Sequence, residues 1–183
     1  MNPDFIGLAK QNKRHIVLPE SNDDRILEAA TEVDQNNIAS ITLLGNVEEV
    51  ISRLNELKLS LGNIQIVDPS DTNNEKIQEY ADALFERRKH KSITPEQANE
   101  LIKSPLYYGA SMVQASDADA CVAGAINSTA NVIRAALHVI GTKTKQTRLS
   151  SFFIYAKWQS WNTKPYFMIL KQIKCHPPTF SHF

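Results

Sequence analysis

Short apolar runs recur along the chain and are separated by longer segments whose apolar residues follow a helical period. Uninterrupted apolar runs are typical of strands that are buried on both faces of a sheet. We expect strands at 15–19, 39–45, 64–69 and 119–125, and a fifth at 148–156. Because helical segments fill the intervals, the sequence predicts an α/β fold, a parallel sheet with helices on both faces.

Several of the predicted helices carry start signals. Ser21, with Asp24 three positions later, is typical of a capping box, and Asn46 is placed to cap the helix after the second strand. The stretch Thr94–Gln97 combines a capping threonine, a proline at the first helical position and a glutamine at the third. Ser104-Pro105 is expected to interrupt the helix that begins there.

A small polar turn follows the strand predicted at 119–125. Ser128 and Thr129 lead into an apolar helix that carries Arg134 one to two turns from its start. In open α/β sheets, ligands bind beyond the carboxyl ends of the strands, and free N–H groups at a helix start favour an anion. The residues therefore predict a phosphate or carboxylate pocket. The alternative is that Ser128 or Thr129 only caps the helix and Arg134 extends into solvent.

A second candidate site for an anion is the basic end of a predicted amphipathic helix. Arg87, Arg88, Lys89, His90 and Lys91 stand in succession there. Guanidinium groups bind phosphate oxygens in a bidentate manner, so the run is suited to a polyanionic ligand. The alternative is a solvated helix end, because cations are favoured at the carboxyl terminus of a helix.

Charge and composition narrow the functional classes. The formal net charge is zero, yet all 20 acidic residues lie at or before Asp119, while eight Lys and Arg follow it. The whole chain thus gives no electrostatic argument for nucleic acid or a membrane surface as a partner. Cys121 and Cys175 form no metal-ligand spacing, the histidines are scattered, and we predict no metal site. With no apparent secretion signal or spanning segment, we expect a cytoplasmic protein.

Six blocks, in this order, resemble phosphate acetyltransferases, also called phosphotransacetylases. They are HIVLPESNDDRILEAA, ITLLGNVEEV, YADALFERRKHKSITPEQA, SPLYYGASMV, DACVAGAINSTANVIRAALHVIGTK and SSFFI. The resemblance runs from about residue 14 to Ile154. It implies reversible transfer of an acetyl group between CoA and phosphate, with CoA or acetyl-CoA as substrate and no tightly bound cofactor or metal. It also implies two α/β domains of the isocitrate/isopropylmalate dehydrogenase-like three-layer type, with the active site between them.

The resemblance also implies roles for individual residues. Arg88 falls on an arginine that contacts phosphate or CoA, and Arg134 on one that holds the transferred phosphate. Ser128 and Thr129 occupy the matching turn and would add donors. The sequence departs from the family pattern at Ser92, where glycine is usual. The serine, arginine and aspartate of the family's second domain have no counterpart here, so we assign no catalytic residue.

The last segment matches none of these blocks. We expect residues 1–154 to form the N-terminal α/β domain of a two-domain enzyme, and residues 155–183 to be a divergent tail. The tail has no acidic residue and contains both tryptophans. Our hypothesis is a shifted reading frame or a truncated gene product, and we expect the shortened chain to have little or no activity.

Three alternatives stay open. The transferred group can be a longer acyl chain, such as propionyl or butyryl, because the acyl pocket is not located by these residues. The chain can instead be a non-catalytic module that binds CoA, phosphate or only a partner protein. Nucleic acid is the least favoured partner, since only Trp158, Trp161 and the basic tail suggest it. We expect small-molecule substrates, no membrane partner and a homodimer.

Overall fold

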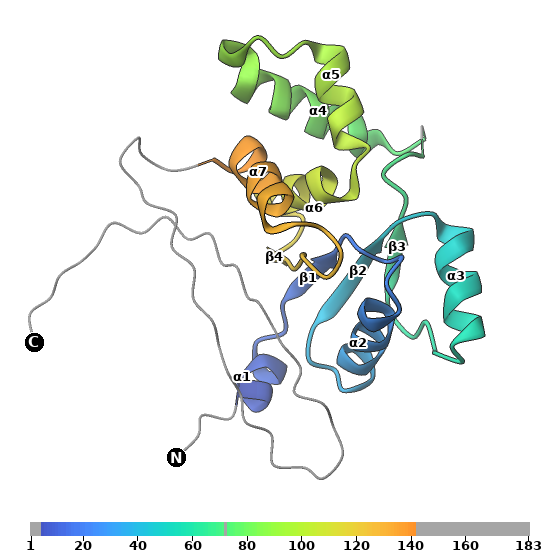
Figure 1. Cartoon of the computed structure of the whole chain (residues 1–183). Helices are drawn as coiled ribbons and strands as arrows, with labels where there is room; N and C mark the ends of the chain where they lie inside the picture. The colour runs from blue at the N-terminus through green and yellow to red at the C-terminus, as the bar shows by residue number, and fades with distance from the viewer. Residues whose placement is uncertain (1–4, 72, 142–183) are drawn as a thin grey trace, which may run out of the picture. The chain divides into compact units, whose positions relative to one another are not determined.

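A four-stranded parallel sheet forms the centre of the computed structural model, which describes residues 5–71 and 73–141. Met1–Ile140 forms one compact unit. The strands lie in the order β3-β2-β1-β4 (Figure 1). Their bounds are β1 His15–Leu18, β2 Ser40–Leu44, β3 Gln65–Val67 and β4 Ala120–Cys121. The parallel α/β sheet predicted from the sequence is therefore confirmed, although β4 is shorter than expected, and the strand predicted at 148–156 lies outside the described residues.

Helices cover both faces of this sheet (Figure 1). Their bounds are α1 Phe5–Gln11, α2 Asp24–Gln35, α3 Val47–Glu56, α4 Glu75–Arg88, α5 Pro95–Ile102, α6 Pro105–Ala115 and α7 Thr129–Val139, with a 3-10 turn at Lys89–Lys91. Neighbouring strand residues point to opposite faces. Leu18 and Leu43 pack with α2 and α3, whereas Val17 and Leu44 pack with α4 to α7. The short β1 and β2 are thus buried on both faces, as their continuous apolar sequences predicted.

Most helix starts follow the predicted caps, with one exception. The Asn46 side chain accepts the N–H of Glu49 at 3.1 Å, and Thr94 and Gln97 form the reciprocal capping box. The capping box predicted at Ser21 is wrong, because Asp23 caps α2. The Ser21 hydroxyl is buried and donates instead to the carbonyl of Leu44, 2.7 Å away on the neighbouring strand.

The residue after the basic end of α4 has an unfavourable backbone conformation. Ser92 adopts φ 59° and ψ 28°, the left-handed region that glycine occupies without steric cost. We expect Ser92→Gly to raise the free energy of unfolding by about 0.5–1 kcal/mol, because relief of the strain exceeds the added entropy of the unfolded chain.

Chemical denaturation of matched variants tests this expectation. Ser104 has φ −73°, so Ser104→Gly makes the same chemical change where no strain is relieved. The control should lose about 0.5–1 kcal/mol through chain entropy alone. Equal losses in both variants would show that Ser92 is unstrained.

Candidate functional site

The turn between β4 and α7 encloses a buried carboxylate at the carboxyl edge of the sheet. Glu20 is about 1% exposed and lies two residues after the end of β1. One carboxylate oxygen accepts the N–H groups of Gly124 and Ala125 at 2.8 and 2.7 Å. The other accepts the N–H and the side-chain amide of Asn127 at 2.8 and 2.9 Å, and more weakly the N–H of Ile126 at 3.3 Å. Glu20 therefore occupies the turn as an internal anion.

This arrangement corrects one part of the sequence interpretation. The N–H groups of the turn were expected to be free for a ligand anion, but Glu20 already accepts four of them. The reason is the strand order, because β1 and β4 are neighbours and the segment after β1 lies beside the turn after β4. An acidic residue directly after a buried strand was the only sequence signal for this contact.

Glu20 is held in its charged form. Burial raises the pKa of its carboxyl group, but the hydrogen bonds from Asn127, Ala125 and Gly124 outweigh burial, so the pKa lies below the usual value. Arg25 adds a contact on the same turn, because its Nη2 donates to the carbonyl of Ala125 at 3.1 Å. The conformation of the turn is therefore maintained by an ionised group at neutral pH.

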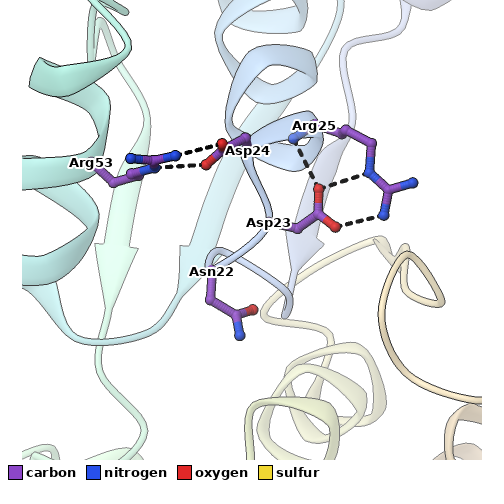
Figure 2. A pocket seen from close by; sticks show the side chains of 5 residues that line it. All are labelled: Asn22, Asp23, Asp24, Arg25 and Arg53. Carbon is purple, nitrogen blue, oxygen red and sulfur yellow. Dashed lines mark hydrogen bonds and ion pairs between the residues drawn. The ribbon is translucent and has the colours of Figure 1, made fainter.

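An open hollow lies beside this turn at the start of α2 (Figure 2). It is lined by Asn22, Asp23, Asp24, Arg25 and Arg53. Arg53 reaches across from α3 and pairs with both oxygens of Asp24 at 2.7 and 2.6 Å, while Arg25 curls back onto Asp23. Because carboxylates already hold both guanidinium groups, this hollow is poorly suited to phosphate. It does not include Arg88 or Arg134.

The site residues predicted after β4 lie at the start of α7 and within its first two turns. The Ser128 hydroxyl accepts the N–H of Asn131 at 3.2 Å, so Ser128 is the cap of α7, as the plainer alternative expected. Thr129 is the exposed first residue of the helix. Arg134 is also exposed and turns back toward the helix start, where its Nη1 donates to the side-chain oxygen of Asn131 at 3.1 Å.

Arg88 ends α4 and lies toward the other end of α7. Helices α4 and α7 pack together, and Nη1 of Arg87 donates to the carbonyl of Ile140 at 2.9 Å. Arg88 is half-buried, whereas Lys89, His90 and Lys91 continue into the exposed 3-10 turn. Only part of the basic run therefore faces the rest of the fold.

A tyrosine–histidine pair lies within electrostatic reach of both arginines. The hydroxyl of Tyr107 on α6 is 2.9 Å from Nδ1 of His138 on α7, and the two rings are tilted with centroids 5.9 Å apart. Burial lowers the pKa of His138, and the charges of Arg88 and Arg134 lower it further. Burial raises the pKa of Tyr107, against the opposing effect of the same two arginines. Both arginines thus act electrostatically on the same pair of rings.

No local sequence pattern marks this pair as part of the site. His138 is one of several scattered histidines, and Tyr107 stands in the block SPLYYGASMV. The available signal was spacing, because His138 lies four residues after Arg134 and therefore on the same helical face. Ser128 and Thr129 lie more than a turn away from this point, at the opposite end of α7 from His138.

Within residues 5–71 and 73–141, no three histidine, cysteine, aspartate or glutamate side chains are grouped so that they could bind a metal ion. None of the helices in the same part of the chain is sufficiently long and apolar to span a bilayer.

Comparison with known sequences gives consistent matches. A family model described as phosphate acetyl/butaryl transferase matches residues 3–167. The phosphate acetyltransferase of Acetivibrio thermocellus is 44% identical over 150 residues, which cover 82% of this chain and 44% of that protein. The phosphate acetyltransferase of Nitratidesulfovibrio vulgaris is 43% identical over 150 residues, or 82% of this chain and 21% of that protein. The chain spans less than half the length of these curated relatives.

Solved structures agree with the sequence matches. A phosphotransacetylase from Staphylococcus aureus superimposes with a TM-score of 0.73 at 34% identity, over 85% of this chain and 48% of that one. A phosphotransacetylase from Streptococcus pyogenes gives a TM-score of 0.75 at 30% identity, over 86% of this chain and 48% of that one. The fold and the sequence therefore point to the same group of proteins.

Proposed function

The chain belongs to the phosphate acetyl/butaryl transferase family, and on that premise we propose that it acts in the reversible transfer of an acetyl group between CoA and phosphate. In this proposal Arg88 and Arg134 bind phosphate groups of the substrates. The observation that carries the function is the match of the family model to residues 3–167, together with 44% identity to a phosphate acetyltransferase. Arg88 and Arg134 lie on α4 and α7, two helices that pack together, and guanidinium groups are suited to phosphate.

The chemistry defines what these arginines contribute. When the CoA sulfur attacks the carbonyl carbon of acetyl phosphate, the carbon–oxygen bond to phosphate breaks and the phosphate leaves with its electron pair. Positive groups that are already in place stabilise this departing charge. Arg88 and Arg134 would hold the phosphate and neutralise its charge. The family resemblance assigns the groups that act on the thiol and the carbonyl to the second domain.

Ser128 and Thr129 have a smaller part in this proposal than the sequence suggested. The Ser128 hydroxyl oxygen accepts the N–H of Asn131, so its main effect is to begin α7 correctly. Thr129 remains exposed at the helix start and is available as a donor to a ligand. We further propose the isocitrate/isopropylmalate dehydrogenase-like two-domain arrangement, a cytoplasmic location and a homodimer, which stay predictions. The boundary at residue 154 and the tail at 155–183 lie outside the described residues.

A non-catalytic CoA-binding module is the second candidate function. It requires only the phosphate contacts proposed for Arg88 and Arg134, and no group that acts on the thiol or the carbonyl. The family description also includes a butyryl-type acyl group, so a longer acyl substrate remains a proposal within the same chemistry.

Two measurements on the 183-residue chain separate these functions. Calorimetric titration with CoA is expected to show binding, and an acetyl phosphate assay with acetyl-CoA and phosphate reports turnover. Binding with turnover supports the transferase, and the same assay with butyryl-CoA then ranks the acyl groups. Binding without turnover supports the module. Absence of CoA binding in a folded sample would contradict both functions.

A further inference from the structure

Three features of His138 bear on ligand binding. It lies four residues after Arg134, about 6 Å along the axis of α7 and on the same face. Its Nδ1 is 2.9 Å from the hydroxyl of Tyr107, which fixes the orientation of the ring. Within residues 5–71 and 73–141, no hydrogen-bond partner contacts the other ring nitrogen, Nε2. The imidazole is therefore oriented by the protein and has one nitrogen available to a ligand.

The charges around His138 come from the elements that pack on it. Arg134 is on the same helix, Arg88 is at the end of α4, and α6 contributes the uncharged Tyr107. Arg87, also on α4, donates to the carbonyl of Ile140 at the end of α7. Both effective charges are thus positive, and together with burial they keep the pKa of His138 below its usual value. Without a bound anion, the ring is neutral at neutral pH.

A bound anion would reverse this balance. Two negative charges beside Arg88 and Arg134 offset the positive potential and make the imidazolium form favourable. A protonated ring carries hydrogen on both nitrogens, so Nδ1–H donates to the Tyr107 oxygen and Nε2–H can donate to a phosphate oxygen. The proton comes from solvent, and no other bond is made or broken.

We propose that His138, oriented by Tyr107, is a third anion-binding group beside Arg88 and Arg134 and takes up one proton when a phosphate dianion binds there. This inference rests on the proposed function, because it requires the two arginines to bind phosphate. The pKa of His138 is then higher in the complex than in the free protein. As the pH falls, the affinity for the dianion begins to increase near the pKa of the complex and levels off below the pKa of the free protein. A rise of about one unit in that pKa on binding corresponds to about tenfold tighter binding at the acidic end.

Sulfate is a suitable probe, because it remains a dianion throughout the range in which histidine titrates, about pH 5 to 8. NMR titration of the His138 ring proton gives its pKa with and without sulfate, and His138→Gln identifies the signal. Calorimetry across the same pH range gives the affinity for sulfate. We expect the pKa of His138 to rise by about one unit with sulfate, and sulfate affinity to increase about tenfold toward acidic pH.

Variants separate the two proposals. Arg134→Gln should raise the pKa of His138 without any ligand, whereas Arg14→Gln, an equal loss of charge on an exposed residue paired with Asp119, should not. His138→Gln should abolish the pH dependence of sulfate affinity, and Tyr107→Phe should make that pH dependence smaller. If a variant does not fold, the shift in the pKa of His138 with sulfate in the wild-type chain still tests the proposal.

The possible failures are distinct. If sulfate binds but the pKa of His138 does not move, or His138→Gln keeps the wild-type pH dependence, the role of His138 is wrong and the arginine site stands. If sulfate, phosphate and CoA all fail to bind the folded wild-type chain, the proposed function fails, and this inference fails with it.

Discussion

Replacing Glu20 with alanine is expected to lower the free energy of unfolding by about 4 kcal/mol or more, or to prevent folding. The change removes the acceptor for the N–H groups of Gly124, Ala125 and Asn127 and for the side-chain amide of Asn127. Each buried donor that loses its partner costs about 1–3 kcal/mol, less whatever water recovers. The loss is large because a single buried side chain accepts hydrogen bonds from several groups of the turn.

Glu20→Gln separates the contribution of the charge of Glu20 to stability from that of its shape. The side chain stays nearly the same size, but one acceptor oxygen becomes an NH₂ group that faces N–H donors, so we expect a loss of about 2 kcal/mol or more. Glu28 is an exposed acid on α2, and Glu28→Gln should stay within about 0.5 kcal/mol of wild type. Denaturation by urea at neutral pH measures all three. Equal stability of the Glu20 and Glu28 variants would contradict the role of Glu20.

The same carboxylate has a predictable pH signature. Because the pKa of Glu20 is lower in the folded chain, its contribution to stability is fully present above the unfolded value, about 4.3, and is lost as the pH falls through the folded pKa. The wild-type chain should therefore lose stability more steeply than Glu20→Gln below about pH 4.3. If the free energy of unfolding of the two proteins falls equally with pH, protonation of Glu20 does not contribute to the loss of stability.

Replacing Arg134 with alanine should weaken the binding of inorganic phosphate about tenfold, and Arg88→Ala should have a similar effect. A hydrogen bond to a charged group contributes about 1.5–3 kcal/mol, and the lower part of that range fits Arg134 because its side chain is exposed. This predicted loss in affinity follows from the proposed phosphate contacts. Arg14→Ala removes an equal charge from a residue that precedes β1 and serves as the matched control.

A double-mutant cycle tests whether the two arginines act on one ligand group. If both bind the same phosphate, the double variant should lose less affinity than the two single losses combined, because the second arginine acts on a ligand already displaced. Additive losses would show that the two arginines act independently and not on one phosphate. If both single variants bind as tightly as Arg14→Ala, the proposed phosphate contacts are wrong.

The sequence determined where each of the two arginine candidates lies in its helix, but not that they act on the same residues. The basic end of α4 and the position of Arg134 in α7 follow from local patterns, since charge at a helix end and helical spacing involve only nearby residues. Their common influence on Tyr107 and His138 depends on the packing of α4, α6 and α7. Tyr107 and His138 are 31 positions apart, so no local pattern joins them.

Sequence by itself determined the positions of the four described strands, the parallel α/β class and the caps at Asn46 and Thr94. Each of these depends on a burial pattern or on hydrogen bonds within a few residues. The tertiary structure alone decided that Glu20 fills the turn before α7, more than 100 positions away, and that Ser21 bonds to Leu44 instead of capping α2. Both contacts arise where adjacent parallel strands end at one edge of the sheet. That proximity is set by strand order, a property of the folded chain that local residue spacing does not contain.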